Sequence, residues 1–137
     1  MCNLVDGVKM KAIDNANHQS VLLMKKIYFD KLIFENKDND ISSFGDEAQL
    51  EVGANFEPSE EETILTLISR LSRKREDRIV VVAEISLKGY FALEGNNEIE
   101  TRKHFQNNML AILFPYLRSQ FTILTSQPGF EPIVLPP

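Results

Sequence analysis

Few residues in this chain have the types and spacing that catalysis or metal binding requires. The two histidines, His18 and His104, lie far apart, and neither belongs to an H-x-x-x-H or H-E-x-x-H pair that would hold a zinc ion. Cys2 is the only cysteine, so the chain has no internal disulfide and no multi-cysteine metal site. The residues therefore predict no metal site and no cofactor.

Nucleophilic and phosphate-binding motifs are also missing. Ser42 and Ser43 lie near Asp46 in a polar stretch, but no G-x-S-x-G motif and no Cys/His pair accompanies them. Residues 95–97 (GNN) lack the flanking glycines of a nucleotide-binding loop, and residues 60–62 (EEE) are typical of a solvated charge run. The sequence therefore predicts a protein that binds other molecules and is not an enzyme.

The bulk properties exclude further classes of protein. A length of 137 residues fits one domain, and 43% hydrophobic with 26% charged residues is ordinary for a globular protein. A net charge of −5 argues against a nucleic-acid partner, since binding phosphates needs clustered Lys and Arg. The longest apolar run, residues 109–116, is shorter than the roughly 20 residues that span a bilayer, and no secretory signal pattern begins the chain. We expect a cytoplasmic protein that does not insert into membranes, which the single cysteine also suits.

Four segments have the alternation or the branched and aromatic content of β-strands. They are residues 21–35, 50–56, 63–71 and 79–93. In the first segment the alternation changes phase near Asp30, as in a bulged strand. The third segment fits a helix or a strand, and its β-branched residues favour a strand. Residues 72–77 are predicted to form the hairpin turn between the last two strands.

A helix is predicted over residues 98–126, with a kink or a restart at Pro115. Arg118 is the only charged side chain between Phe105 and Ser126, and apolar residues lie on two faces of the helix. One small sheet covers only one of these faces, so we expect the other to pack on a second copy of the chain. After Gln127 the prolines predict an extended segment. The predicted class is α+β: a four-stranded antiparallel sheet and a long kinked C-terminal helix through which the chain oligomerises.

Three of these segments carry a resemblance to a known family. Residues 80–93, then 110–118 (LAILFPYLR) and 130–137, resemble the second half of SecB, a bacterial protein-export chaperone. Residues 26–28 and 34–35 are similar to the first strand of that family. The resemblance implies a SecB-like domain over residues 24–137. Residues 1–23 are then an N-terminal extension, expected to be a partly disordered arm.

The resemblance implies an assembly and a function. SecB is a dimer of dimers with its helices sandwiched between sheets, so we expect a homotetramer. SecB continues into a final helix beyond the position of Pro137, so we expect a reduced member of the family without that helix. Its members hold non-native polypeptides in apolar grooves, which implies an ATP-independent holding chaperone acting in protein export. The alternative is a chaperone or interaction subunit dedicated to one partner, such as an antitoxin.

By position, the resemblance also assigns surfaces. The expected client contacts, along a crossover loop and the second strand, are Ile41, Phe44, Leu50, Val52, Ala54 and Phe56. The residues expected to dock the export motor SecA are Glu35, Val82 and Glu84, although Lys31 stands where the family has an acidic residue. The expected oligomer interface consists of Ala83, Ile85, Leu87, Ile112, Phe114, Tyr116 and Phe121. Without the resemblance, Ile41 and Phe44 are better explained as loop anchors on the protein's own core.

Overall fold

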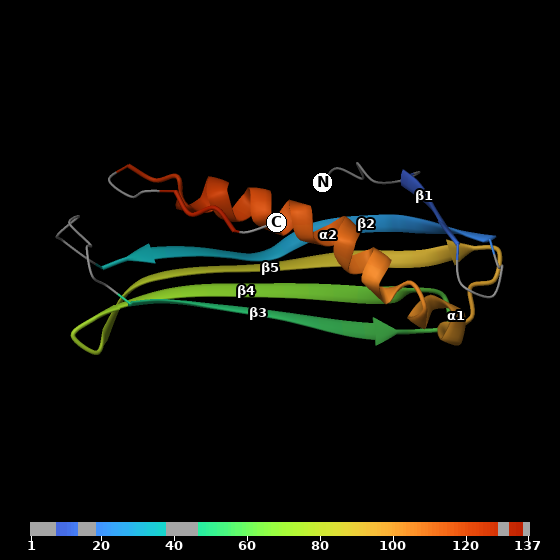
Figure 1. The fold of residues 1–137 in the computed structure, drawn as a ribbon, viewed down its shortest axis with the longest axis horizontal. Helices are drawn as coiled ribbons and strands as arrows, with labels where there is room; N and C mark the ends of the chain where they lie inside the picture. Colours follow the sequence, from blue (N-terminus) through green and yellow to red (C-terminus); the bar gives the residue numbers. More distant parts are fainter. Residues whose placement is uncertain (1–7, 14–18, 38–46, 129–131, 136–137) are drawn as a thin grey trace.

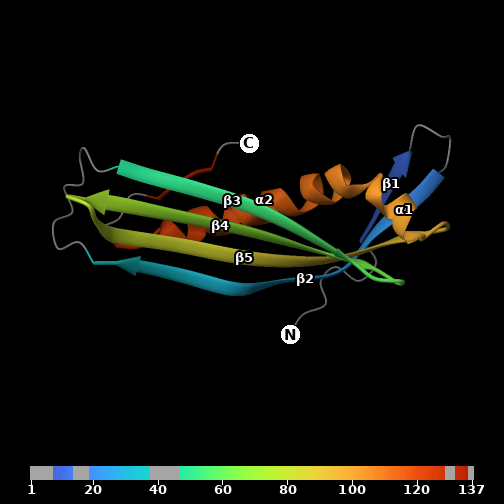
Figure 2. The same cartoon turned by 90° about the horizontal axis from the view of Figure 1, so that it is seen from below.

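The fold is one antiparallel sheet with helices on one face, as Figures 1 and 2 show. The structure is a computed structural model that describes residues 8–13, 19–37, 47–128 and 132–135. In chain order the elements are β1 (Val8–Ile13), β2 (Gln19–Asn36), β3 (Glu47–Pro58), β4 (Thr63–Arg75), β5 (Arg78–Glu94), α1 (Ile99–Lys103) and α2 (Gln106–Thr125). The strand order is β1-β2-β5-β4-β3, so β3 lies at one edge of the sheet.

The four predicted strands are confirmed as β2 to β5, and β1 adds a fifth strand that the sequence did not predict. β1 pairs antiparallel with the first part of β2, from Val8 opposite Met24 to Ile13 opposite Gln19. Residues 8–13 and 19–23 of the expected extension are therefore strand rather than a disordered arm. The expected boundary at residue 23 falls within β2, and Leu22 is buried in the core.

β2 contains two bulges. Its pairing with β5 shifts register between Met24 and Lys26 and again between Phe29 and Lys31. The second shift confirms the change of phase predicted near Asp30. Because of the extra residue, Phe29 and Leu32 lie opposite Leu87 and Ile85 and share one face of the sheet.

The β4–β5 turn is tighter than predicted. Residues 72–75 continue β4, and Arg75 pairs with Arg78, so the turn is Glu76 and Asp77 alone. Both have positive φ, 51° and 63°, as two-residue hairpin turns that follow the strand twist require.

α2 packs over β5, β4 and β2, and we call the covered side of the sheet the helix face and the opposite side the outer face. Fully buried side chains of the sheet and helix form the core, among them Leu65, Leu67, Ala83, Ile85, Leu87, Phe91, Met109, Leu113, Leu117 and Phe121. The predicted helical region is broken at His104–Phe105, and α2 continues through Pro115. The restart expected at Pro115 is therefore wrong, and a kink there is not confirmed.

A buried arginine ties the start of the helical region to the β3–β4 turn. Arg102 donates hydrogen bonds from Nε to the carbonyl of Asn97 (3.1 Å), from Nη1 to Thr63 Oγ1 (2.9 Å) and from Nη2 to the carbonyls of Ser59 and Glu60. The Asn97 side chain donates to the Glu61 carbonyl (2.7 Å) and accepts from the Leu93 N–H (2.8 Å). Together these bonds hold one end of β3 and β4 against α1.

Gly89 allows α2 to approach the sheet closely. A Cβ added at Gly89 would lie 2.9 Å from a ring carbon of Phe91 and 3.0 Å from a methyl of Leu113. We expect Gly89→Ala to lower the free energy of unfolding by about 1–3 kcal/mol, since overpacking forces the helix or the side chains to move. A Cβ at Gly53 meets nothing within 4 Å, so Gly53→Ala is the matched control, with an expected gain of at most about 1 kcal/mol. Urea denaturation measures both, and equal effects would contradict the close approach.

Candidate functional site

An apolar row on β3 lies open on the helix face. Leu50, Val52, Ala54 and Phe56 pair with Leu71, Ser69, Leu67 and Leu65 of β4, whose side chains are buried on that face. Directly paired residues point to the same side of a sheet, so the four β3 side chains share the helix face. We call them the β3 strip.

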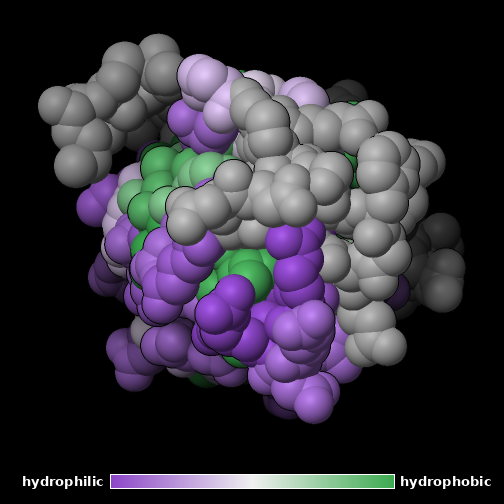
Figure 3. All heavy atoms as spheres, turned by 90° about the vertical axis from the view of Figure 1, so that its left-hand side faces the viewer, coloured by the Kyte–Doolittle hydropathy of each residue, from purple (hydrophilic) through white to green (hydrophobic). Residues whose placement is uncertain are grey.

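The β3 strip is exposed because α2 does not extend over it. The helix packs on β5, β4 and β2, and β3 lies beyond β4 at the edge. Val52 keeps 50% of its surface exposed, Leu50 and Ala54 are exposed, and Phe56 is half-buried. Figure 3, an end-on view of the molecule, shows that the surface at this end is mostly polar with small apolar areas. Four of the six expected client contacts therefore form one accessible apolar surface.

The free edge of β3 lies beside this surface. Among the strands that the structure describes, none pairs with the outer side of β3 over its 12 residues. An open edge offers alternating backbone N–H and C=O groups to another extended chain. The site thus combines apolar side chains with main-chain hydrogen-bonding groups. Ile41 and Phe44, the other two expected contacts, lie outside the described residues.

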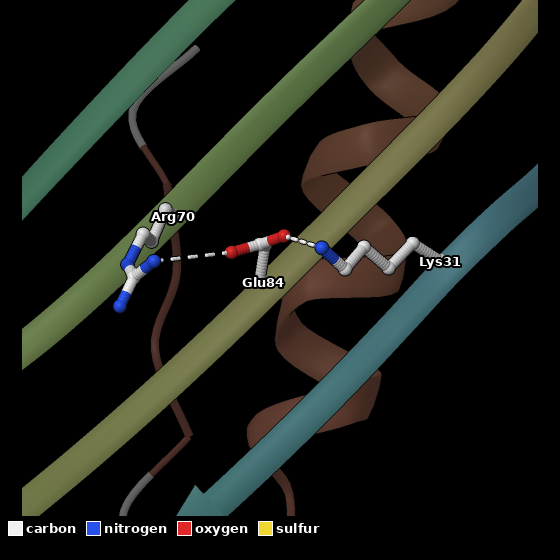
Figure 4. Close-up of polar contacts among 3 residues, drawn as sticks. All are labelled: Lys31, Arg70 and Glu84. Atoms are coloured by element: carbon white, nitrogen blue, oxygen red, sulfur yellow. Dashed lines mark hydrogen bonds and ion pairs between the residues drawn. The ribbon is translucent and has the colours of Figure 1, made fainter.

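The residues expected to dock a motor lie together on the outer face. Glu35 pairs with Val82, and Glu84 lies in the next outward-facing position of β5. Glu84 has a side-chain exposure of 13% and lies between Lys31 Nζ at 2.5 Å and Arg70 Nη1 at 3.5 Å, as Figure 4 shows. Glu35 pairs with Lys37 Nζ at 3.0 Å. Both carboxylates therefore have cationic partners, and this region is not a continuous acidic surface.

The same outer face carries a shallow depression. It has a volume of about 310 Å³ and is lined by the outer-face residues Glu51, Gly53, Ile68, Arg70 and Glu84, and by Val52, which lies between Glu51 and Gly53 on the edge strand. Its lining mixes charged and apolar groups. Within the described parts of the chain, no group of three or more His, Cys, Asp or Glu residues lies together as metal ligands would, and no helix has the length and apolarity needed to cross a bilayer.

Two stacked tyrosines lie further along the outer face. The rings of Tyr28 and Tyr90 have centroids 6.2 Å apart, and Lys26 Nζ lies 5.1 Å and 5.4 Å from them. A hydrogen bond with Tyr28, together with burial, raises the pKa of Tyr90 to about 12. This phenol therefore stays neutral well above the pH at which a free tyrosine ionises.

The raised pKa of Tyr90 predicts a loss of stability in strong base. Because the folded-state pKa exceeds the ordinary value of 10.0, Tyr90 contributes stability that is complete below pH 10 and is lost as the pH rises towards about 12. Ultraviolet titration of phenolate absorbance, with Tyr90→Phe to identify the step, measures the pKa. We expect Tyr28→Phe to lower it towards 10.0. An unchanged pKa in Tyr28→Phe would contradict the role of the hydrogen bond.

The structure separates the seven residues expected at an oligomer interface into two groups. Ala83, Ile85, Leu87 and Phe121 are completely buried in the core of a single chain, between the sheet and α2, so they are not available to a second chain in this conformation. Ile112 and Phe114 are half-buried and Tyr116 is exposed. The sequence pattern of apolar residues on two helix faces did not show which face the sheet covers.

One apolar flank of α2 remains at least partly exposed. Ile112, Tyr116 and Ile123 follow one another at helical spacing, and Ile123 keeps 62% of its surface exposed. We call these three residues the α2 flank. The sequence pattern placed apolar residues on two faces of the helix, and the exposure of Ile123 follows only from the packing of Met109, Leu113 and Phe121 against the sheet.

A family model and a solved structure match this architecture. The model of the SecB family, described as preprotein translocase subunit SecB, matches residues 15–137. The chain therefore belongs to the SecB family, a family of chaperones rather than enzymes, as the sequence resemblance predicted. β1 precedes the matched residues.

The structural comparison supports the same fold. A Mycobacterium tuberculosis SecB-like chaperone, solved in complex with a ChAD peptide from the HigA1 antitoxin, has a TM-score of 0.64 and 15% sequence identity, and the match covers 84% of this chain and 88% of that chain. A Streptococcus agalactiae protein of unknown function has a TM-score of 0.45 and 13% identity, with 84% and 96% of the two chains covered. A search of curated proteins finds no match.

Proposed function

We propose that this protein is an ATP-independent holding chaperone that binds unfolded or non-native polypeptides at the β3 strip. The observation that carries the proposal is the open apolar row of β3 beside an unpaired strand edge. Family membership supports the same reading. A cytoplasmic location and a contribution to protein export belong to this proposal.

The physical basis is the pairing of two non-specific interactions. Apolar side chains of a client bury against Val52 and its neighbours, which stabilises the complex by about 25 cal/mol per Å² of apolar surface removed from water. The edge of β3 meanwhile hydrogen-bonds to the client backbone, whose geometry does not depend on sequence. Such a surface accepts many sequences with low specificity. Phe44, which lies outside the described residues, remains a proposed additional contact.

Suppression of aggregation tests the proposal. The purified protein is mixed, without ATP, with several unrelated unfolded proteins, and light scattering follows their aggregation. We expect suppression for most of them at a comparable ratio of chaperone to client. Activity toward none of them would remove the chaperone function.

A second candidate function is service to one dedicated partner, such as an antitoxin. It is favoured by the Mycobacterium tuberculosis structural neighbour, which was solved with a peptide from an antitoxin. The same assay separates the two functions, because a dedicated chaperone should protect one protein and leave the others to aggregate. A toxin and antitoxin pair beside the gene would favour this candidate.

We further propose assembly into a homotetramer, a dimer of dimers, with contacts through the α2 flank. The exposure of Ile123 and Tyr116 supports it, because an apolar flank of this kind is commonly covered in an oligomer. Light scattering measures the mass, and a single-chain mass at micromolar concentration would contradict the assembly. Docking of SecA on Glu35, Val82 and Glu84 is the part with least support, because lysine and arginine side chains already pair with both carboxylates.

A further inference from the structure

The segment 132–135 lies extended on the helix face beside α2. Figure 4, viewed through the sheet from the outer face, shows it crossing behind β4 and β5, with α2 beside it. Figure 2 shows the same segment running alongside the helix. Part of the segment therefore lies over β4, the strand next to β3 in the order of the sheet.

Two threonines of α2 hold the backbone of this segment. Thr125 Oγ1 accepts a hydrogen bond from the Ile133 N–H at 2.8 Å, and Thr122 Oγ1 donates one to the Ile133 carbonyl at 3.1 Å. Both contacts are to main-chain groups. They recognise an extended backbone and are insensitive to the identity of the side chain it carries.

Alternate side chains of the segment point inward. Leu135 is only 3% exposed and belongs to the hydrophobic core, and Ile133 is half-buried against it. Val134, between them, is 72% exposed. This two-residue alternation is that of a strand, although the segment pairs with no strand of the described sheet.

We propose that the apolar surface beside α2 that residues 132–135 cover is a binding site for extended polypeptide, that these residues are its resident occupant, and that client segments compete with them for it. The inference rests on the proposed holding function and extends the client site from the β3 strip across β4. The ligand class is an extended segment with branched apolar side chains at alternate positions. Clients can then bind only while the resident segment is away from the site. The apparent association constant for a client is therefore the intrinsic constant multiplied by the fraction of time that the site is free.

Leu135→Ala tests the competition without changing the residues of the surface beneath the segment. It removes the buried anchor of the resident segment, whereas Thr122, Thr125 and the β3 strip stay intact. The matched control is Val134→Ala, which shortens the neighbouring exposed side chain. The probe is a labelled polypeptide that cannot refold, reduced and carboxymethylated lysozyme, and fluorescence anisotropy measures its affinity.

We expect Leu135→Ala to bind this probe about tenfold or more tightly than the wild type, because large-to-small changes at buried positions weaken an occupant by more than that factor. Val134→Ala should bind like the wild type. A synthetic peptide of residues 128–137 should reverse the gain, and the same peptide with Leu135→Ala should not. An unchanged or weaker affinity in Leu135→Ala would overturn the inference and make the segment purely structural.

Hydrogen exchange of the wild-type protein gives a test that does not depend on a variant folding. Saturating probe should accelerate exchange of the backbone amides of residues 133–135, and unchanged or slower exchange there would overturn the inference. If the wild type binds no unfolded probe, the proposed function fails. In that case the synthetic 128–137 peptide tests separately whether residues 132–135 occupy a site. The peptide should bind the Leu135→Ala variant but not the wild type. A failure to bind the variant would also overturn the inference.

Discussion

Val52→Asp is expected to weaken binding of unfolded clients by about tenfold or more while the fold stays intact. Val52 is half exposed at the centre of the β3 strip, so a carboxylate there is solvated in the free protein and costs little stability. A bound client would remove that carboxylate from water without supplying a partner, at a cost of about 1–3 kcal/mol or more. Anisotropy titration with an unfolded client measures the change, and circular dichroism checks the fold.

Gln49→Asp is the control for this prediction. Gln49 lies on the same edge strand but pairs with Ser72 on the outer face. The substitution therefore introduces the same charge on the opposite side of the sheet. We expect its client affinity to stay within about twofold of the wild type, since rim charges mainly change association rates. Equal losses in the two variants would show a general effect of charge and would refute the β3 strip as the client site.

Arg102→Met is expected to lower the free energy of unfolding by about 3 kcal/mol. Its guanidinium is almost completely buried and donates to Thr63 Oγ1 and to three backbone carbonyls. Hydrogen bonds from charged groups contribute about 1.5–3 kcal/mol, and methionine leaves these acceptors unpaired while it keeps most of the apolar stem.

The control is Lys103→Met, the next residue of α1, whose exposed ammonium has only a 3.5 Å pairing with Glu100. Its free energy of unfolding should change by no more than about 0.5 kcal/mol. Urea denaturation compares the two variants. Similar midpoints would mean that water replaces the bonds of Arg102 and that this residue does not hold the β3–β4 turn in place.

Local patterns predicted much of this fold correctly. The alternation in residues 50–56 and 79–93 corresponds to β3 and β5, and the change of phase near Asp30 corresponds to a bulge in β2. These signals depend on neighbours in the sequence, because side chains alternate with a period of two along any strand. The LAILFPYLR segment carried the family resemblance, which the family match confirms.

Features made by distant parts of the chain were not predicted. The six residues of β1 show no strong pattern, and they are a strand because they pair with β2. Arg102 lies 43 positions from Ser59 in the sequence, so no local spacing indicated that the two are bonded. The burial of Ala83, Ile85, Leu87 and Phe121 likewise depends on which side of the sheet α2 covers.

The sequence by itself therefore determined the strands β2 to β5, the presence of a C-terminal helical region, the family, and the apolar row of Leu50, Val52, Ala54 and Phe56. Only the tertiary structure decided that this row is open, because β3 is an edge strand that α2 does not reach. It also decided that residues 132–135 bind beside α2, because Thr122 and Thr125 meet the Ile133 backbone only once the chain turns back on itself. The exposure of the β3 strip and the position of residues 132–135 both depend on how distant segments pack. The alternation of apolar residues along the chain carries no information about that packing.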